Sequence, residues 1–90
     1  MNQELIEGIV SHFGKESQVA KAIEEMGELI TELARSQNGK ASNVNILGEI
    51  ADVSIMVAQL RYIYGADQVD HHIQMKLNRI GEKISTFRFD

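Results

Sequence analysis

The chain contains, at residues 46–58, the apolar stretch ILGEIADVSIMVA. This stretch belongs to a longer segment, residues 43–64, that is apolar on nearly every side, which a helix tolerates only when other elements surround it. Within the quoted stretch only Glu49, Asp52 and Ser54 are polar. The sequence therefore predicts a buried, central helix over 43–64 that carries two carboxylates.

Three further segments repeat apolar residues at helical spacing. They predict helices over residues 2–13, 17–36 and 67–84, with Ser17 and Asp67 as caps at the starts of the last two. In the second of these helices the apolar stripe consists of Val19, Ile23, Met26, Ile30 and Leu33. The chain has no proline, and its composition favours helices over strands.

Turn formers fill residues 36–43, which we expect to be a loop that ends in a helix cap. The four helices predict an all-α fold, a four-helix antiparallel bundle formed by a single domain over residues 1–90. Ninety residues with 43% hydrophobic content are few for an independent core. We therefore expect homo-oligomerisation, as a homodimer or homotetramer, to complete the bundle.

Composition excludes several classes of protein. The absence of cysteine excludes disulfides, thiolate metal sites and a cysteine nucleophile, and it fits the reducing cytoplasm, where we expect the protein to reside. The sequence has neither a signal peptide nor an apolar run long enough to span a membrane. A formal net charge of −4 argues against a duplex nucleic acid partner.

Glu49 and Asp52 are unusual residues for an apolar helix. Three positions apart, they differ by about 60° around the helix axis, so both side chains can point at one spot. Burial and mutual repulsion both disfavour their ionised forms. Two adjacent hard oxygen ligands suit Mg²⁺, so the pair indicates a metal site.

The second helix supplies matching carboxylates. If it packs antiparallel to the helix over 43–64, Glu25 and Glu28 face Glu49 and Asp52, and four carboxylates around one pocket hold one or two divalent ions. Gly27, in the middle of that helix, suggests a close approach of the two helices beside the acids. The alternative is a solvated acidic face paired with neighbouring basic residues.

A cationic ridge recurs along the fourth helix at steps of four, three and four, from His72 to Lys83. Arginine binds phosphate oxygens bidentately and lysine acts as a movable point charge. A solvated face that balances the acidic helices is the alternative. The candidate phosphate-binding residues are Lys21, Lys76, Asn78, Arg79 and Lys83.

The pattern Glu24-Glu25-x-x-Glu28, a spacer, then Glu49-x-x-Asp52 resembles the signature of the MazG-like all-α nucleoside triphosphate pyrophosphohydrolases. The likeness extends from about Gln18 to Arg79. The resemblance implies a short, single-domain, house-cleaning enzyme that hydrolyses a nucleoside triphosphate to the monophosphate and pyrophosphate. It also implies a site for Mg²⁺, with Mn²⁺ as an alternative, formed by Glu25, Glu28, Glu49 and Asp52.

In such an enzyme the resemblance gives Glu24 a place behind the metal ligands or beside the attacking water. Either Glu24 or Glu28 is positioned to accept the proton of that water. The alternatives are a non-catalytic helical homo-oligomer and a nucleotide-binding regulatory module. A di-iron oxidoreductase needs Glu-x-x-His on two helices, which this sequence lacks.

Overall fold

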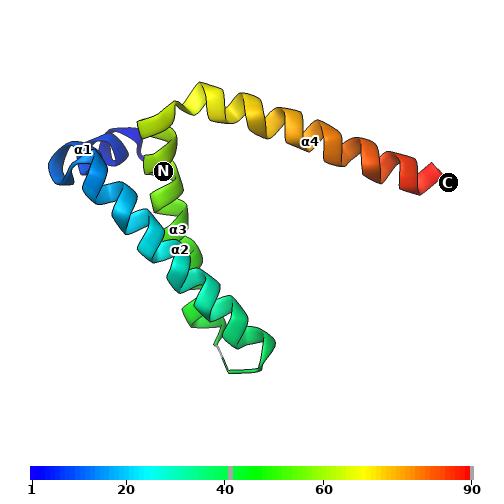
Figure 1. The fold of residues 1–90 in the computed structure, drawn as a ribbon, viewed down its shortest axis with the longest axis horizontal. Coiled ribbons are helices and arrows are strands. Elements are labelled where there is room, and N and C mark those ends of the chain that lie inside the picture. Colours follow the sequence, from blue (N-terminus) through cyan, green and yellow to red (C-terminus); the bar gives the residue numbers. More distant parts are fainter. Residues whose placement is uncertain (41, 90) are drawn as a thin grey trace.

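The computed structural model describes residues 1–40 and 42–89, with side chains as far as Ser85. The described residues form four α-helices and no strand (Figure 1). The all-α class and the number of helices predicted from the sequence are therefore confirmed. The helices are α1 (Gln3–Phe13), α2 (Lys15–Gln37), α3 (Asn43–Tyr64) and α4 (Ala66–Phe89).

Two of the caps differ from those predicted. Helix α2 begins directly after Gly14, so Ser17 lies inside the helix, and α4 begins at Ala66, so Asp67 lies in its first turn. Helix α3 does begin at a cap, because the Ser42 hydroxyl accepts a hydrogen bond of 3.2 Å from the backbone N–H of Asn45. Helix α4 also continues past residue 84, the predicted end, to Phe89.

Helices α2 and α3 form an antiparallel pair, and α1 packs against both near the end opposite the α2–α3 loop (Figure 1). The buried apolar side chains are Ile6 and Val10 of α1, Ala22 of α2 and Met56 of α3. The small core therefore lies where α1 meets the antiparallel pair.

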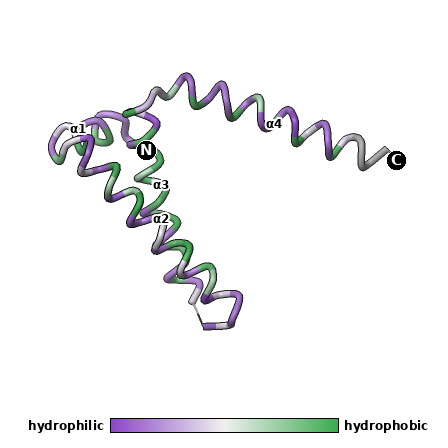
Figure 2. The backbone as a smooth tube through the Cα atoms, in the orientation of Figure 1, coloured by the Kyte–Doolittle hydropathy of each residue, from purple (hydrophilic) through white to green (hydrophobic). Residues whose placement is uncertain are grey.

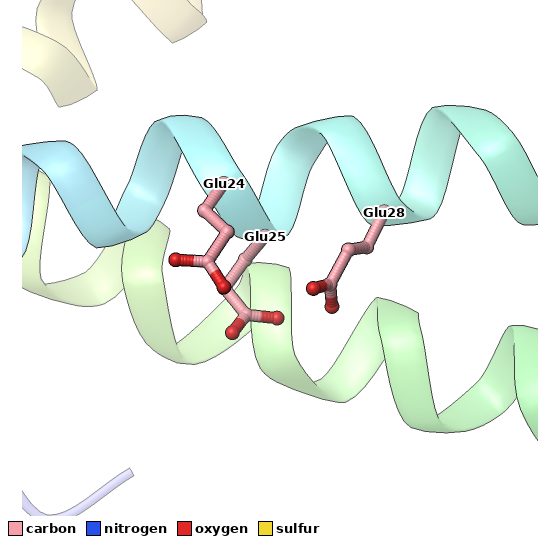
Figure 3. Close-up of side chains that lie close together, drawn as sticks. All are labelled: Glu24, Glu25 and Glu28. Carbon is pink, nitrogen blue, oxygen red and sulfur yellow. The ribbon is translucent and has the colours of Figure 1, made fainter.

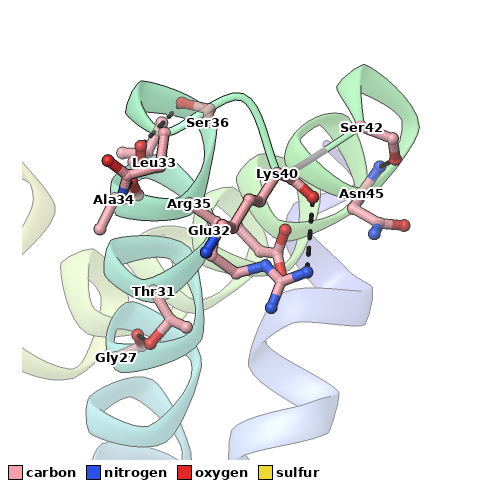
Figure 4. A network of polar contacts seen from close by, with 11 residues as sticks. Gly27, Thr31, Glu32, Leu33, Ala34, Arg35, Ser36, Lys40, Ser42 and Asn45 are labelled. Atoms are coloured by element: carbon pink, nitrogen blue, oxygen red, sulfur yellow. Dashed lines mark hydrogen bonds and ion pairs between the residues drawn. The ribbon is translucent and has the colours of Figure 1, made fainter.

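The far end of the pair is closed by polar contacts (Figure 4). The Arg35 guanidinium donates a hydrogen bond of 3.4 Å to the Lys40 carbonyl, and its Nε lies 3.8 Å from a carboxylate oxygen of Glu32. Thr31 donates a hydrogen bond of 3.0 Å to the Gly27 carbonyl.

A Cβ added at Gly27 would meet nothing within 4 Å. The predicted close helix approach at Gly27 is therefore wrong.

Helix α4 projects from the other three helices (Figure 1). Among the described helices it contacts only α3, and the Arg61–Asp70 ion pair, at 2.6 Å, bridges the corner. Gly65 alone links α3 to α4, whereas two helices that fold back on each other usually need about two to five loop residues. One chain thus packs three helices together and leaves the fourth outside the predicted bundle.

This arrangement leaves much apolar surface open. Only Met56 and Gln59 are buried in α3, while Val44 and Leu47 are 77% and 67% exposed, so α3 is not surrounded within one chain. Helix α3 is largely hydrophobic, and the mainly hydrophilic α4 carries short hydrophobic bands along its length (Figure 2). The accessible surface is 6998 Å², against roughly 5,300 Å² for a compact monomer of this mass.

The overall dimensions also show that one chain is less compact than a typical domain of its length. The radius of gyration is 16.6 Å, where about 12 Å is typical of a compact domain of this length. Among the described residues, no helix combines the length and the apolar character needed to cross a membrane.

Candidate metal centre

The face that α2 turns toward α3 carries polar residues. Its buried residues are Gln18, Ala22 and Glu25, whereas Ile23 and Ile30 of the predicted apolar stripe are 69% and 67% exposed. Steps of four and three place positions 18, 22 and 25 on one line of the helix. Helix α2 therefore buries a carboxylate against α3 and leaves much of its apolar stripe uncovered.

Five carboxylates form two overlapping groups. One oxygen from each of Glu25, Glu49 and Asp52 lies within 4.8 Å of the others, which joins α2 to α3. Along α2, oxygens of Glu24, Glu25 and Glu28 lie equally close to one another (Figure 3). The four metal ligands expected from the sequence thus fall into two groups that share Glu25.

Two oxygens of these groups are buried without a hydrogen-bond partner, Oε2 of Glu25 and Oε2 of Glu49. The other oxygen of Glu25 lies 3.4 Å from the Lys21 ammonium. Because a buried carboxylate is unfavourable unless it is paired, a cation near these unpartnered oxygens would stabilise them. Asp52 is exposed and leaves the position of such a cation open to solvent.

The charges of the cluster act on one another. The Glu25 carboxylate, followed by desolvation and by Glu49, raises the pKa of Glu28 above its ordinary value. The hydrogen bond and charge of Glu25 raise the pKa of Lys21. The site is therefore strongly negative, and one lysine only partly compensates for it.

The donor set fits a hard divalent cation. Both groups consist of carboxylates, with no histidine among the described members, and oxygen ligands of this kind suit Mg²⁺ or Mn²⁺ better than zinc. Glu32, on the same face of α2, belongs to neither group; one of its oxygens pairs with Arg35, and the other is buried without a hydrogen-bond partner.

The candidate phosphate-binding residues are not all near this site. Lys21 contacts Glu25. The residues of α4 are exposed on the helix that projects away, where the Asn78 side chain accepts a hydrogen bond of 2.9 Å from Gln74. One chain therefore does not bring these residues to the carboxylates: Lys76, Asn78, Arg79 and Lys83.

A cavity of about 440 Å³ adjoins the carboxylates. Its lining includes two buried amides, Gln18 and Gln59, which the sequence analysis did not single out. Their spacing contains the signal, because Gln18 precedes Glu25 by seven residues and Gln59 follows Asp52 by seven. Seven residues are nearly two helical turns, so each amide shares a helix face with a carboxylate of the site.

No protein-family model, no curated protein and no solved structure matches this chain. Membership of the MazG-like superfamily stays a prediction from the two-part motif.

Proposed function

We propose that the protein is a Mg²⁺-dependent nucleoside triphosphate pyrophosphohydrolase, which converts a nucleoside or deoxynucleoside triphosphate to the monophosphate and pyrophosphate. One observation carries the proposal: oxygens of Glu25, Glu49 and Asp52 gather within 4.8 Å across two helices, and two buried oxygens there have no partner. The motif resemblance adds the reaction class.

In this reaction Glu25, Glu49 and Asp52 hold the metal, with Glu28 as a fourth ligand. A Mg²⁺ ion held by these residues would supply positive charge against the triphosphate and would make the attacking water more acidic. The water oxygen forms a bond to phosphorus, the bond of the α–β phosphoanhydride breaks, and pyrophosphate leaves. No covalent bond to the protein forms.

The proton released by the water passes to a carboxylate on the exposed side of the cluster. Glu24 and Glu28 are both exposed and lie beside Glu25 (Figure 3). Glu24 accepts this proton when Glu28 serves as the fourth metal ligand, and Glu28 accepts it when three carboxylates hold the metal. Lys21 lies at the same edge and is suited to contact a phosphate oxygen.

The proposed role of the α4 residues requires a second copy of the chain. Gly65 holds α4 away from its own bundle, so Lys76 and Arg79 reach carboxylates only if those belong to another copy. Residues 1–71 carry eleven carboxylates and five Lys or Arg, a net charge of −6, whereas residues 72–90 carry two and four, a net charge of +2. The positively charged residues 72–90 of one copy and the negatively charged residues 1–71 of another copy therefore attract each other.

The uncovered area is sufficient for such an assembly. The accessible surface exceeds that of a compact monomer by roughly 1,700 Å², and a standard interface buries about 800 Å² on each partner. The protein is accordingly proposed to work as a homodimer or homotetramer.

The function is tested by incubating the pure protein with Mg²⁺ and a panel of canonical and modified nucleoside triphosphates, with EDTA controls, and separating the products. Monophosphate with pyrophosphate is the expected result. Diphosphate with phosphate would keep a metal hydrolase but reject this chemistry. If no product forms but Mg²⁺ raises the melting temperature, the result would favour a nucleotide-binding regulator. If no product forms and Mg²⁺ has no thermal effect, the result would favour a non-catalytic oligomer.

A further inference from the structure

The cavity beside the carboxylates has two kinds of lining. Its walls are largely apolar, with Ile9 and Phe13 from α1 and Ile55 and Met56 from α3. Its polar lining residues come from the facing helices α2 and α3: Ser17, Gln18, Lys21, Glu25, Asp52 and Gln59. Apolar walls with a few placed polar groups are typical of a small-molecule site, and a volume of about 440 Å³ lies in the range for one.

Gln59 is the uncharged side chain in this lining that lacks a hydrogen-bond partner for a buried atom. It is 2% exposed, and its Oε1 is buried without a hydrogen-bond partner. An unpaired buried amide oxygen destabilises the fold, so a turn of the Gln59 amide toward the cavity, where a ligand N–H can pair with it, is favoured. Gln18, 5% exposed on the facing helix, places a second amide in the same cavity.

We propose that this cavity binds the base of the nucleotide and that Gln59 recognises the base through an N–H group on its edge. A base is planar and largely apolar on its faces, which suits walls formed by Phe13 and Met56, and its edge carries the donors and acceptors that an amide can pair with. This inference rests on the proposed function, because it assigns the remainder of the same substrate.

The shared residues connect the two parts of the site. Lys21, Glu25 and Asp52 line the cavity, and Glu25 and Asp52 also belong to the carboxylate group. A ligand in the cavity therefore lies directly beside the metal position. A base held between the amides leaves its sugar and triphosphate on the side of Lys21 and the carboxylates.

The test measures binding without turnover. Isothermal titration with Mg²⁺ compares inorganic triphosphate with α,β-methylene analogues of the four nucleoside triphosphates, which cannot be cleaved between the α and β phosphorus atoms. The wild-type protein should bind its preferred base analogue about tenfold more tightly than inorganic triphosphate. Gln59→Leu should abolish that preference and leave inorganic triphosphate binding within about twofold. The exposed Gln37→Leu, a matched control on α2, should change neither affinity.

A second pair of ligands tests the hydrogen bond itself. Methylation that removes the N–H donors of the preferred base, N3-methyl on uracil or N6,N6-dimethyl on adenine for example, should weaken binding to the wild type about tenfold and leave Gln59→Leu unaffected. Melting curves check that the variant folds. Because the substitution removes an unpaired buried oxygen, the ligand-free midpoint should hold or rise. If Gln59→Leu does not fold, Gln59→Met replaces it, because methionine is unbranched like glutamine.

The outcomes separate this inference from the proposed function. Equal binding of base analogues and inorganic triphosphate by the wild type, or an unchanged base preference in Gln59→Leu, would overturn it. Base-selective binding that depends on Gln59, in a protein that releases no pyrophosphate, would leave the inference standing and reject the hydrolase. Release of pyrophosphate from every triphosphate with no influence of Gln59 would support the hydrolase and reject the role of Gln59 in base recognition.

Discussion

At the scale of single residues, the metal proposal depends on carboxylates that are more stable with a cation than without one. Glu25 is 9% exposed and has one buried oxygen without a partner. In the metal-free protein, Glu25, Glu49 and Asp52 repel one another at close range. Removing one charge therefore relieves the fold while it removes a ligand, and this opposite effect distinguishes a metal site from an ordinary structural contact.

Glu49→Gln and Asp52→Asn should each lower Mg²⁺ affinity and turnover while the metal-free melting temperature holds or rises. Loss of a residue that only supports a metal ligand typically costs about 10- to 100-fold in metal affinity or activity, so loss of a direct ligand should cost at least that. Titration with Mg²⁺, turnover and melting in EDTA measure the three quantities. The control is Glu82→Gln, on exposed α4. Lower metal-free stability with unchanged activity would refute the ligand assignment.

The pH dependence of the metal-free protein has a defined sign. Since the folded state raises the pKa of Glu28 above 4.5, this group favours folding at a pH below about 4.5, and that contribution is lost as pH rises through the higher folded pKa. In EDTA, Glu28→Gln should therefore match the wild type under acidic conditions and exceed its stability near neutral pH. Denaturant unfolding across this range checks it, and parallel curves for the two proteins would contradict it.

At the scale of elements, the sequence predicted the helices better than their packing. The four helices follow from local apolar spacing, and a cap at the end of the loop over 36–43 was expected, which the structure places at Ser42. The buried face of α2 did not, because Ile23 and Ile30 have the apolar spacing that normally marks a core face, yet Glu25 faces α3. Which face is buried depends on the partner helix, and the apolar spacing of a single helix does not identify that partner.

The corner between α3 and α4 rests on Gly65. Its φ of +119° is rarely adopted by other residues, whereas the Gln68 amide that a Cβ would meet is the end of a flexible side chain and can move aside. Gly65→Ala should therefore lower stability by about 1–3 kcal/mol. The same substitution at Gly27, where the Cβ position is open, should stabilise α2 by about 0.5–1 kcal/mol. Denaturant unfolding of both variants tests this, and equal effects would mean that the corner does not depend on glycine.

At the scale of the whole molecule, uncovered apolar residues on α3 and α4 predict self-association. Within one chain, Ile50 is 44% exposed and Leu77 is 55% exposed. Sedimentation should give a multiple of the 10.1 kDa chain mass. Leu77→Glu and Ile50→Glu should shift the protein toward the monomer, while Ser11→Glu, an exposed polar site on α1, should not. A wild-type monomer at high concentration would reject the assembly.

Assembly also decides whether the cationic ridge of α4 belongs to the candidate metal site. Glu49→Gln removes a carboxylate of the metal site. The double variant Lys76→Ala/Arg79→Ala removes the phosphate-binding side chains of α4. Each protein alone should therefore turn over slowly. If α4 of one copy serves the carboxylates of another, co-expressed mixed oligomers contain one intact site, formed by the Glu49→Gln copy's α4 and the double variant's carboxylates. Purification through two different tags isolates these oligomers for assay. Turnover well above either parent would place the ridge in a neighbour's site, because a site built within one chain is broken in both parents and stays broken in the mixture.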